Sequence, residues 1–481
     1  MRKNALFYTA LLLLLLSLLA GCAAPALPPA AAAEPTPEPT PEPTPEPTPE
    51  PTPEPVVFAN GSVPADTETL TMALRAGETA LLDALPALRE AELSGSEDAA
   101  EILAWRDSHP AVTLRCDAVL PDGTVLPCDA EEADLSGLRH SEAEAAITQL
   151  RLLPGLRRIE LGQRSEDEDA LRWEDVGAFQ AAFPDAEVEY RFTLFDKDFS
   201  TLDERMILSH RKMTDQGEAV RELLPYMTRC RFLDMDSCGV DNEHMAAIRD
   251  DFPDIKVVWR VWFGTVYTCR TDVTRILASS ESEAIYNADS AGLYYCTDVV
   301  YMDIGHSKLT DLSFLYNMPK LEVLIVACAP WTDPTPIGSL SELEYLEVLS
   351  TFCSSVEPFA NLHKLKHLNI GNCSRITDIT PLYGMTQLER LWIGSVTPVP
   401  EEQKEKIREM LPDTVINTTT RNHKSEGWCK DRYQVNVPRY ALLREQFGDY
   451  QGSAYAYAWS DILARKSLDE LTEEELLLVK P

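Results

Sequence analysis

The segment LEYLEV at residues 343–348 is one of five copies of a pattern with apolar residues at its first, fourth and sixth positions. The other copies begin at Val299, Leu321, Leu365 and Leu388, so successive copies start 22, 22, 22 and 23 residues apart. Apolar residues separated in this way alternate like those of a short β-strand. The nearly constant interval predicts a repeat protein in which each unit contributes one strand.

A second apolar cluster follows the strand in each unit, most clearly at residues 309–315 and 376–382. A 22-residue unit buries only one edge by itself, so its apolar residues must be covered by neighbouring units. The two patterns together resemble the bacterial leucine-rich repeat of the internalin type. That resemblance implies an α/β solenoid in which each unit has a strand followed by a short helical turn.

One position in each repeat departs from that resemblance. The family usually has Asn or Cys three positions after the last apolar residue of the strand, where the side chain bonds the turning backbone. In this chain the position is occupied by Ser307, Ala329, Thr351, Cys373 and Val396. A regular asparagine ladder is therefore not expected, although small side chains fit the crowded turn.

The first 21 residues have the features of a bacterial export signal. Arg2 and Lys3 precede an apolar run at residues 11–16, which is too short to span a membrane. Residues 19–22, LAGC, resemble the lipobox of bacterial lipoproteins, which implies that Cys22 carries a diacylglyceryl thioether and becomes the mature N-terminus. Two acyl chains anchor far more firmly than one, so we expect the protein on the outer face of the bacterial cytoplasmic membrane. The alternative is an ordinary signal peptide with an incidental cysteine.

A proline-rich linker follows within residues 22–56. Pro-Glu-Pro-Thr repeats without interruption from Glu34 to Pro55. Proline at every second position favours an extended polyproline conformation, which at about 3.1 Å per residue reaches roughly 70 Å. A disordered tether with no length requirement fits the same composition.

Charge and cysteine content restrict the partners and the covalent chemistry. The formal charge is −35, which disfavours nucleic acid as a partner. Cys116 and Cys128 flank Pro121-Asp122-Gly123, and a three-residue hairpin loop there makes residues whose numbers sum to 244 face each other. A disulfide between them is predicted for that register, whereas a two-residue Asp-Gly turn would break it. Cys230, Cys238 and Cys373 occupy inward-facing repeat positions and are expected to be buried thiols.

A longer repeat precedes the regular one. Matching stretches begin at Leu85-Pro86, Leu153-Pro154 and Leu224-Pro225, 68 and 71 residues apart. Each continues into a strand, a helix that ends at a proline, an extended stretch and a hairpin, which we interpret as two repeat-like turns with an inserted β-hairpin. The helix stop recurs as His109-Pro110, Phe183-Pro184, Phe252-Pro253 and Leu411-Pro412.

The sequence thus predicts an α/β leucine-rich-repeat solenoid with inserted β-hairpins in its N-terminal half and a C-terminal cap. The cap is expected from Gly427, Trp428 and an aromatic run at residues 450–459, because an open solenoid end exposes core. The whole arrangement resembles leucine-rich-repeat lipoproteins of Gram-positive anaerobes, which implies no reaction. The predicted segments are a signal peptide at 1–21, a lipidated cysteine and linker at 22–56, irregular long repeats at 57–296, regular repeats at 297–400, and a cap and tail at 401–481.

No motif predicts a catalytic or metal site, and neither a cofactor nor a metal is expected. His363 and His367 are four residues apart but lack the glutamate of a zinc helix and fall across a turn. Residues 234–245 resemble a calcium loop only superficially, since Met245 stands where the twelfth-position glutamate is needed. The chain is therefore not predicted to be an enzyme.

The repeats do predict a surface. The third and fifth residues of each strand point away from the core, so stacked strands present them side by side on a concave sheet. The ten candidate binding residues are Tyr301, Asp303, Val323, Ile325, Tyr345, Glu347, His367, Asn369, Arg390 and Trp392. Tyr, Trp and Arg are the residue types in which binding energy concentrates.

Three functions remain open from the sequence. The first is a cell-surface, membrane-anchored lipoprotein that binds a protein, peptide or cell-wall ligand through the concave face. The second is an envelope hydrolase with a carboxylate site in the hairpin-bearing half, and the third is a structural envelope spacer. The competing interpretation of the face is that Tyr345 and Trp392 pack against each other or against the C-terminal cap.

Overall fold

The computed structural model describes residues 54–279, 282–421 and 428. From Pro55 onward the chain forms one compact unit. The signal peptide, the lipobox, most of the linker and the tail beyond residue 428 lie outside the described residues. Within the described ranges, no helix combines the length and the apolar character needed to cross a membrane.

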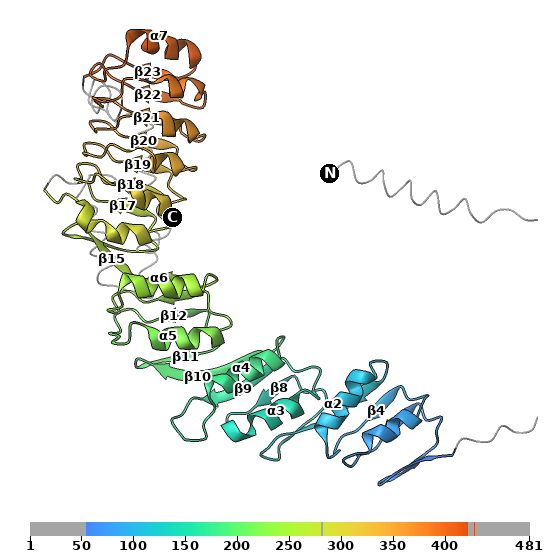
Figure 1. The fold of residues 1–481 in the computed structure, drawn as a ribbon. Coiled ribbons are helices and arrows are strands. Elements are labelled where there is room, and N and C mark those ends of the chain that lie inside the picture. Colours follow the sequence, from blue (N-terminus) through green and yellow to red (C-terminus); the bar gives the residue numbers. More distant parts are fainter. Residues whose placement is uncertain (1–53, 280–281, 422–427, 429–481) are drawn as a thin grey trace, which may run out of the picture. The chain divides into compact units, whose positions relative to one another are not determined.

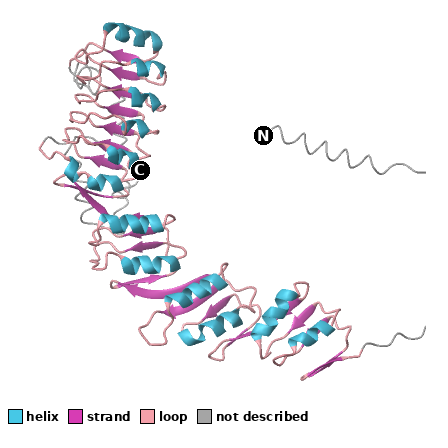
Figure 2. Ribbon diagram, in the orientation of Figure 1, coloured by secondary structure: helices cyan, strands magenta, loops and turns pink. Residues whose placement is uncertain are grey.

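Parallel sheets built from one strand per turn of the chain form the body of the protein (Figures 1 and 2). The first sheet has the order β3-β4-β5 and is preceded by the hairpin β1–β2. Its elements are β1 (Val56–Phe58), β2 (Gly61–Val63), β3 (Thr69–Thr71), η1 (Thr79–Ala84), β4 (Glu90–Glu92), α2 (Ala99–Ser108) and β5 (Thr113–Arg115). The hairpin β6 (Ala118–Val119) and β7 (Val125–Leu126) follows it.

The second sheet has the order β11-β10-β9-β8, in which only the outermost pair, β10 with β11, is antiparallel. Its elements are β8 (Glu132–Asp134), η2 (His140–Glu142), α3 (Ala143–Leu150), β9 (Arg158–Gln163), α4 (Trp173–Ala182), β10 (Glu187–Leu194) and β11 (Lys197–Ser200). The third sheet is β12-β13-β14, and the hairpin β15–β16 follows it. Its elements are β12 (Arg205–Ile207), α5 (Glu218–Leu223), η3 (Leu224–Tyr226), β13 (Phe232–Asp234), α6 (Asn242–Asp251), β14 (Lys256–Val258), β15 (Arg260–Phe263) and β16 (Tyr267–Arg270).

Each long repeat differs from the prediction in one respect. The extended stretch after the helix is not a separate feature, because it pairs in parallel as the third strand of the same sheet, as β5, β10 and β14. The hairpins come where they were predicted, and in the second repeat β10 simply continues into its hairpin. The apolar residues of these stretches explain the pairing, since Val188, Tyr190 and Phe192 are all buried.

The regular repeats form one seven-stranded parallel sheet from β17 to β23. Its elements are β17 (Arg275–Leu277), η4 (Asn287–Asp289), η5 (Ala291–Tyr295), β18 (Tyr301–Asp303), η6 (Ser313–Asn317), β19 (Val323–Ile325), η7 (Ile337–Ser339), β20 (Tyr345–Glu347), η8 (Glu357–Asn361), β21 (His367–Asn369), η9 (Thr380–Gly384), β22 (Arg390–Trp392), α7 (Glu401–Met410) and β23 (Val415–Asn417). The sheet begins before residue 297 and ends after residue 400, so it crosses both boundaries predicted for the regular repeats.

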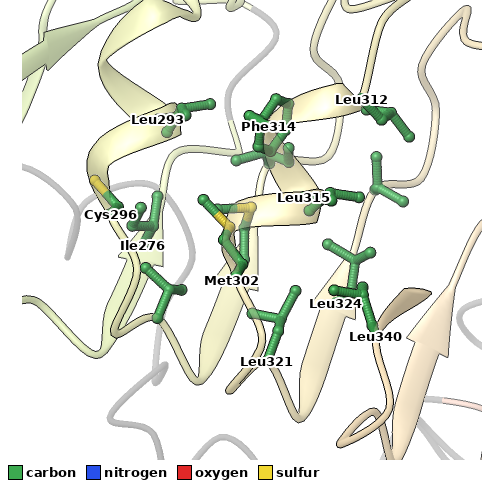
Figure 3. Packing of buried hydrophobic residues seen from close by; sticks show 14 of the residues in the cluster. Ile276, Leu293, Cys296, Met302, Leu312, Phe314, Leu315, Leu321, Leu324 and Leu340 are labelled. Atoms are coloured by element: carbon green, nitrogen blue, oxygen red, sulfur yellow. The ribbon is translucent and has the colours of Figure 1, made fainter. Parts of the chain in front are cut away.

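The sheet's register confirms that successive repeats share one core. Leu324 is paired with Leu346 and Leu346 with Leu368, and all three side chains are fully buried in a single apolar cluster. Figure 3 shows Met302 and Leu324 pointing from neighbouring strands toward Phe314 on the helical side. This cluster runs without interruption from the third sheet to α7, whereas the first two sheets have apolar clusters of their own.

Proline ends the four helices at the predicted places. The residues that close α2, α4, α6 and α7 are His109, Phe183, Phe252 and Leu411, each with φ between −131° and −123° and ψ between 60° and 67°. Each is followed directly by proline, which excludes the helical conformation from the residue before it. The sequence signal is local, so it survives in every sheet context.

The turn position without asparagine is satisfied by other side chains. The Cys373 thiol donates to the carbonyl oxygen of Val348 in the preceding repeat at 3.1 Å, and the Thr351 hydroxyl donates to the same oxygen at 2.8 Å. In the last repeat the bond comes from Thr397 to the Ile370 carbonyl at 3.1 Å, not from the predicted position of Val396. That repeat is one residue longer, which moves the inward-facing position by one.

The predicted Cys116–Cys128 disulfide is not formed. The hairpin register is as predicted, with Ala118 opposite Leu126, but pairing stops there and both cysteines are free thiols. The Asp117 carboxylate accepts the Cys128 backbone N–H at 2.9 Å, which ends the ladder before the cysteines oppose each other. The Cys116 thiol instead turns toward the Leu93 carbonyl oxygen at 3.4 Å. The prediction of buried free thiols at positions 230, 238 and 373 is confirmed.

Candidate functional site

The ten predicted binding residues lie in two rows on one face of the seven-stranded sheet, which we call the outer face. One row pairs Tyr301, Val323, Tyr345, His367 and Arg390 in register, and the other pairs Asp303, Ile325, Glu347, Asn369 and Trp392. Since strand residues alternate between faces, both rows lie opposite the leucines of the shared core. Their apolar members form a separate cluster from that core.

The outer face is not open in this structure. Nine of the ten side chains are buried, and only Asp303 is partly exposed. Trp428 is fully buried and belongs to the same apolar cluster as Tyr345 and Trp392. The competing interpretation therefore describes these two residues correctly, because they pack against a residue of the C-terminal segment.

Trp428 is held on the outer face by its ring, its indole N–H and its backbone. The N–H donates to Oε1 of Glu347 at 2.7 Å, and Nη2 of Arg390 donates to the Trp428 carbonyl oxygen at 3.0 Å. The ring centroid lies 5.4 Å from that of Tyr345 and 5.3 Å from that of Trp392. The Arg390 guanidinium lies 4.4 Å from the Trp428 centroid, within reach of a cation–π contact. These contacts use residues from β20 and β22.

This placement corrects the prediction for Trp428. The residue was expected in a cap over the last repeat, but it lies across the face of strands that precede the last one. A buried tryptophan removes about 150–250 Å² from water, worth up to about 4–6 kcal/mol before the entropy of ordering is subtracted. The other cap residues, at positions 450–459, lie outside the described residues.

Glu347 is the polar centre of the site. Its carboxylate is buried at 2% exposure and accepts hydrogen bonds from the Tyr345 hydroxyl as well as from Trp428. A buried carboxylate is costly unless donors surround it. The arrangement therefore favours a ligand that brings a hydrogen-bond donor into an aromatic setting.

His367 lies in the same row and contacts an aromatic ring. Its ring centroid is 5.8 Å from that of Tyr345, and its Nε2 is 3.6 Å from an oxygen of Glu389. The described residues include no group of three or more His, Cys, Asp or Glu side chains that would hold a metal ion. His367 is thus part of the outer face and not of a pair with His363.

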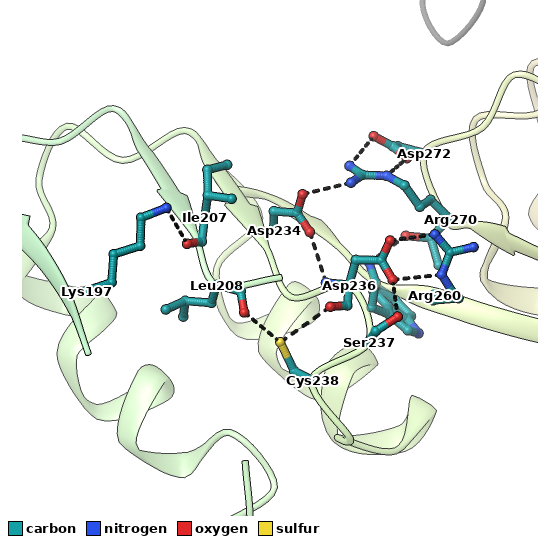
Figure 4. Close-up of polar contacts among 12 residues, drawn as sticks. Lys197, Ile207, Leu208, Asp234, Asp236, Ser237, Cys238, Arg260, Arg270 and Asp272 are labelled. Atoms are coloured by element: carbon teal, nitrogen blue, oxygen red, sulfur yellow. Dashed lines mark hydrogen bonds and ion pairs between the residues drawn. The ribbon is translucent and has the colours of Figure 1, made fainter. Parts of the chain in front are cut away.

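The carboxylates of the superficial calcium loop are used by the hairpin β15–β16. Arg270 donates to Asp234 at 2.7 Å and to Asp272 at 3.0 and 2.9 Å, while Arg260 donates to Asp236 at 2.8 and 2.6 Å (Figure 4). Burial raises the pKa of Asp234, and the opposing charge of Arg270 only partly offsets that effect. The side chains of Asp234, Asp236 and Arg270 are completely covered, so they form a structural ion-pair network and not a site for calcium or substrate.

A second group of carboxylates lines a surface hollow of about 730 Å³ beside β9. Asp167, Glu168 and Asp169 are consecutive residues of one loop there. Hydrogen bonds from the side chain and backbone of Ser141 lower the pKa of Asp169. A lowered pKa keeps the group ionised near neutral pH, which is the opposite of what a general acid requires. These contacts give the hydrolase alternative no support.

Sequence reasoning missed the two arginines of the hairpin and the position of Trp428. Arg270 sits in an alternating strand, where a polar residue is normally read as exposed. Trp428 lies 81 residues from Glu347 and outside any repeat. The available signal was a single tryptophan in a locally basic stretch of an acidic chain.

Structural comparisons find repeat proteins of bacteria. One is an internalin, inlF, from Listeria monocytogenes, with 18% identity, 75% of this chain and 84% of that chain covered, and a TM-score of 0.29. Another is an LRR protein from Leptospira interrogans, with 13% identity, 70% and 91% covered, and a TM-score of 0.26. A third is the functional domain of InlJ from Listeria monocytogenes, which includes a cysteine ladder, with 10% identity, 75% and 65% covered, and a TM-score of 0.26.

No protein-family model matches the sequence, and no curated protein matches it. The structural matches have low identities and TM-scores below 0.5, so no functional argument is built on them. The leucine-rich-repeat character of this chain rests on its own strand register and shared core. The chain has an α/β repeat fold.

Proposed function

We propose that this chain binds a protein or peptide through the outer face of β17–β23, and that it is an exported, lipid-anchored cell-surface protein. The observation that carries the binding proposal is the seating of Trp428. A side chain distant in sequence is held there together with its own backbone carbonyl. The face therefore has the contacts that recognition of a peptide requires.

The residue types of the face support the same function. Tyr345, Arg390 and Trp392 are of the kinds that dominate binding energies at interfaces. They converge on one point, because parallel in-register strands set their rows side by side. The acidic composition of the chain, with 43 basic against 78 acidic residues, disfavours a nucleic-acid ligand.

The anchoring part of the proposal rests on the sequence of residues 1–56. In it, residues 1–21 direct export, Cys22 carries the lipid, and the Pro-Glu-Pro-Thr linker separates the anchor from the leucine-rich-repeat solenoid with its inserted hairpins and C-terminal segment. A Cys22→Ser variant expressed in a Gram-positive host should be released from the membrane fraction. Retention of this variant at wild-type levels would contradict lipid anchoring.

A pulldown from envelope extract tests the binding part. The bait is the wild-type chain or a Tyr345→Ala, Trp392→Ala double variant, and the expected result is loss of bound partners from the variant. Tyr316→Ala is the matched control, because Tyr316 is 53% exposed and lies on η6, away from the outer face. Equal recovery of partners by a folded double variant would refute binding at this face.

A further inference from the structure

The site around Trp428 selects for an indole. The ring contacts two aromatic rings and a guanidinium, while the N–H is directed at the buried Glu347 carboxylate. Phenylalanine offers the ring without the donor, and an aliphatic side chain offers neither. A hydrogen bond to a charged group is among the stronger ones in proteins, so Glu347 discriminates between tryptophan and phenylalanine.

Two further contacts indicate that the site reads main chain as well as side chain. Arg390 donates to the Trp428 carbonyl oxygen at 3.0 Å. The indole N–H of Trp392 is buried and has no hydrogen-bond partner within the part of the chain that the structure describes. A buried donor without an acceptor is unfavourable, and a peptide carbonyl brought in by a ligand would satisfy it.

The charge around Trp428 differs from that of the chain as a whole. Residues 421–432 contain four Lys or Arg residues and two Asp or Glu residues, whereas the full chain has 43 and 78. A basic segment and an acidic body attract each other at moderate salt. Charge therefore favours a ligand that is basic on both sides of its tryptophan.

We infer that the ligand of the outer face is a basic peptide segment of a partner protein that carries a tryptophan, and that Trp428 occupies the same site in competition with it. This inference rests on the proposed function, which it deepens by naming the class of ligand. In the described structure the site is filled from within the chain. The apparent affinity for a partner is then reduced by the fraction of molecules in which Trp428 is seated.

Fluorescence anisotropy with a labelled peptide tests the inference. The probe is a synthetic peptide with the sequence of residues 421–432, with serine in place of Cys429, and the control probe also has alanine in place of Trp428. The full-chain wild type and the Trp428→Ala variant are titrated into each probe. We expect the variant to bind the tryptophan peptide about tenfold or more tightly than the wild type does, and to bind the alanine peptide about tenfold or more weakly.

A Trp428→Phe variant keeps the test decisive if Trp428→Ala does not fold. It retains an aromatic ring in the site but lacks the N–H donor to Glu347, so its affinity for the tryptophan peptide should lie between those of the other two proteins. Equal affinities for both peptides, or no gain on changing Trp428, would overturn the inference. So would a wild-type dimer that becomes monomeric in the variants, because Trp428 would then fill the site of a second copy.

The outcomes separate this inference from the proposed function. If the double variant loses its envelope partners but the peptides show no preference, the tryptophan inference fails and binding at the outer face stands. If the peptides show the preference but no partner depends on the face, the site assignment stands and the proposed function fails.

Discussion

Replacement of Arg270 by methionine should unfold the region around β13 more readily than any exposed arginine change. The Arg270 side chain is fully buried and joins two carboxylates, of which Asp234 is also fully buried and Asp272 is 13% exposed. Methionine keeps the apolar stem of arginine, so the loss is mainly one of charge. Removal of one partner from a buried ion pair costs about 3–5 kcal/mol. We expect the loss at Arg270 to lie in that range, because Asp234 would keep its charge without a counter-ion.

Hydrogen–deuterium exchange of the β13 and β16 amides is the appropriate measurement, since arrays of repeats need not unfold in two states. Arg221→Met is the matched control, because Arg221 pairs with Asp251 at the surface and such pairs contribute about 0–1 kcal/mol. Adding Asp234→Asn to Arg270→Met should restore at least half of the lost free energy. A loss at Arg270 no larger than that of the control would refute the reasoning.

The pH dependence of the Arg270→Met loss gives an independent check. Burial already raises the pKa of Asp234, and removal of Arg270 takes away the charge that opposes this rise. The folded state then binds the proton more tightly than the unfolded state, whose pKa is 3.8. The destabilisation should therefore be greatest at neutral pH and should shrink as the pH falls toward 4. A destabilisation that grows on acidification would contradict this account of the network.

Packing contacts lead to three other predictions. Leu346→Ala should lower the free energy of unfolding by about 2–5 kcal/mol in urea denaturation, because the fully buried side chain would leave a cavity; a loss under about 1 kcal/mol would argue against the shared core. Gly292→Ala should destabilise by about 1–3 kcal/mol, since an added Cβ would lie 2.3 Å from the Trp262 carbonyl oxygen, while Gly384→Ala, with no atom within 4 Å, should change the thermal midpoint little. Burial raises the pKa of Cys353 from 9.0 to about 12, so its thiol should resist alkylation in the folded protein, and its contribution to stability should be constant below pH 9 and lost as the pH rises toward 12; equal alkylation rates in buffer and in urea would contradict this.

Features that depend on short or periodic patterns could be predicted from the amino-acid sequence alone. Leucines that return every 22 residues can be buried together only if successive strands pair in register, so the alignment of Leu324, Leu346 and Leu368 followed from spacing. Proline after Phe183 and Phe252 ended two helices for a purely local steric reason. The two rows of the outer face followed from the same register.

What those patterns contact became known only from the folded chain. Trp428 reaches Glu347 across 81 residues that follow no repeat, so no spacing in the sequence encodes the meeting. Cys116 and Cys128 stand at opposed positions but do not bond, because the Asp117 carboxylate accepts the Cys128 N–H and ends the strand pairing first. Periodicity fixes how neighbouring turns of the chain stack, whereas contacts between distant segments depend on where the chain returns and on which polar groups reach each other first.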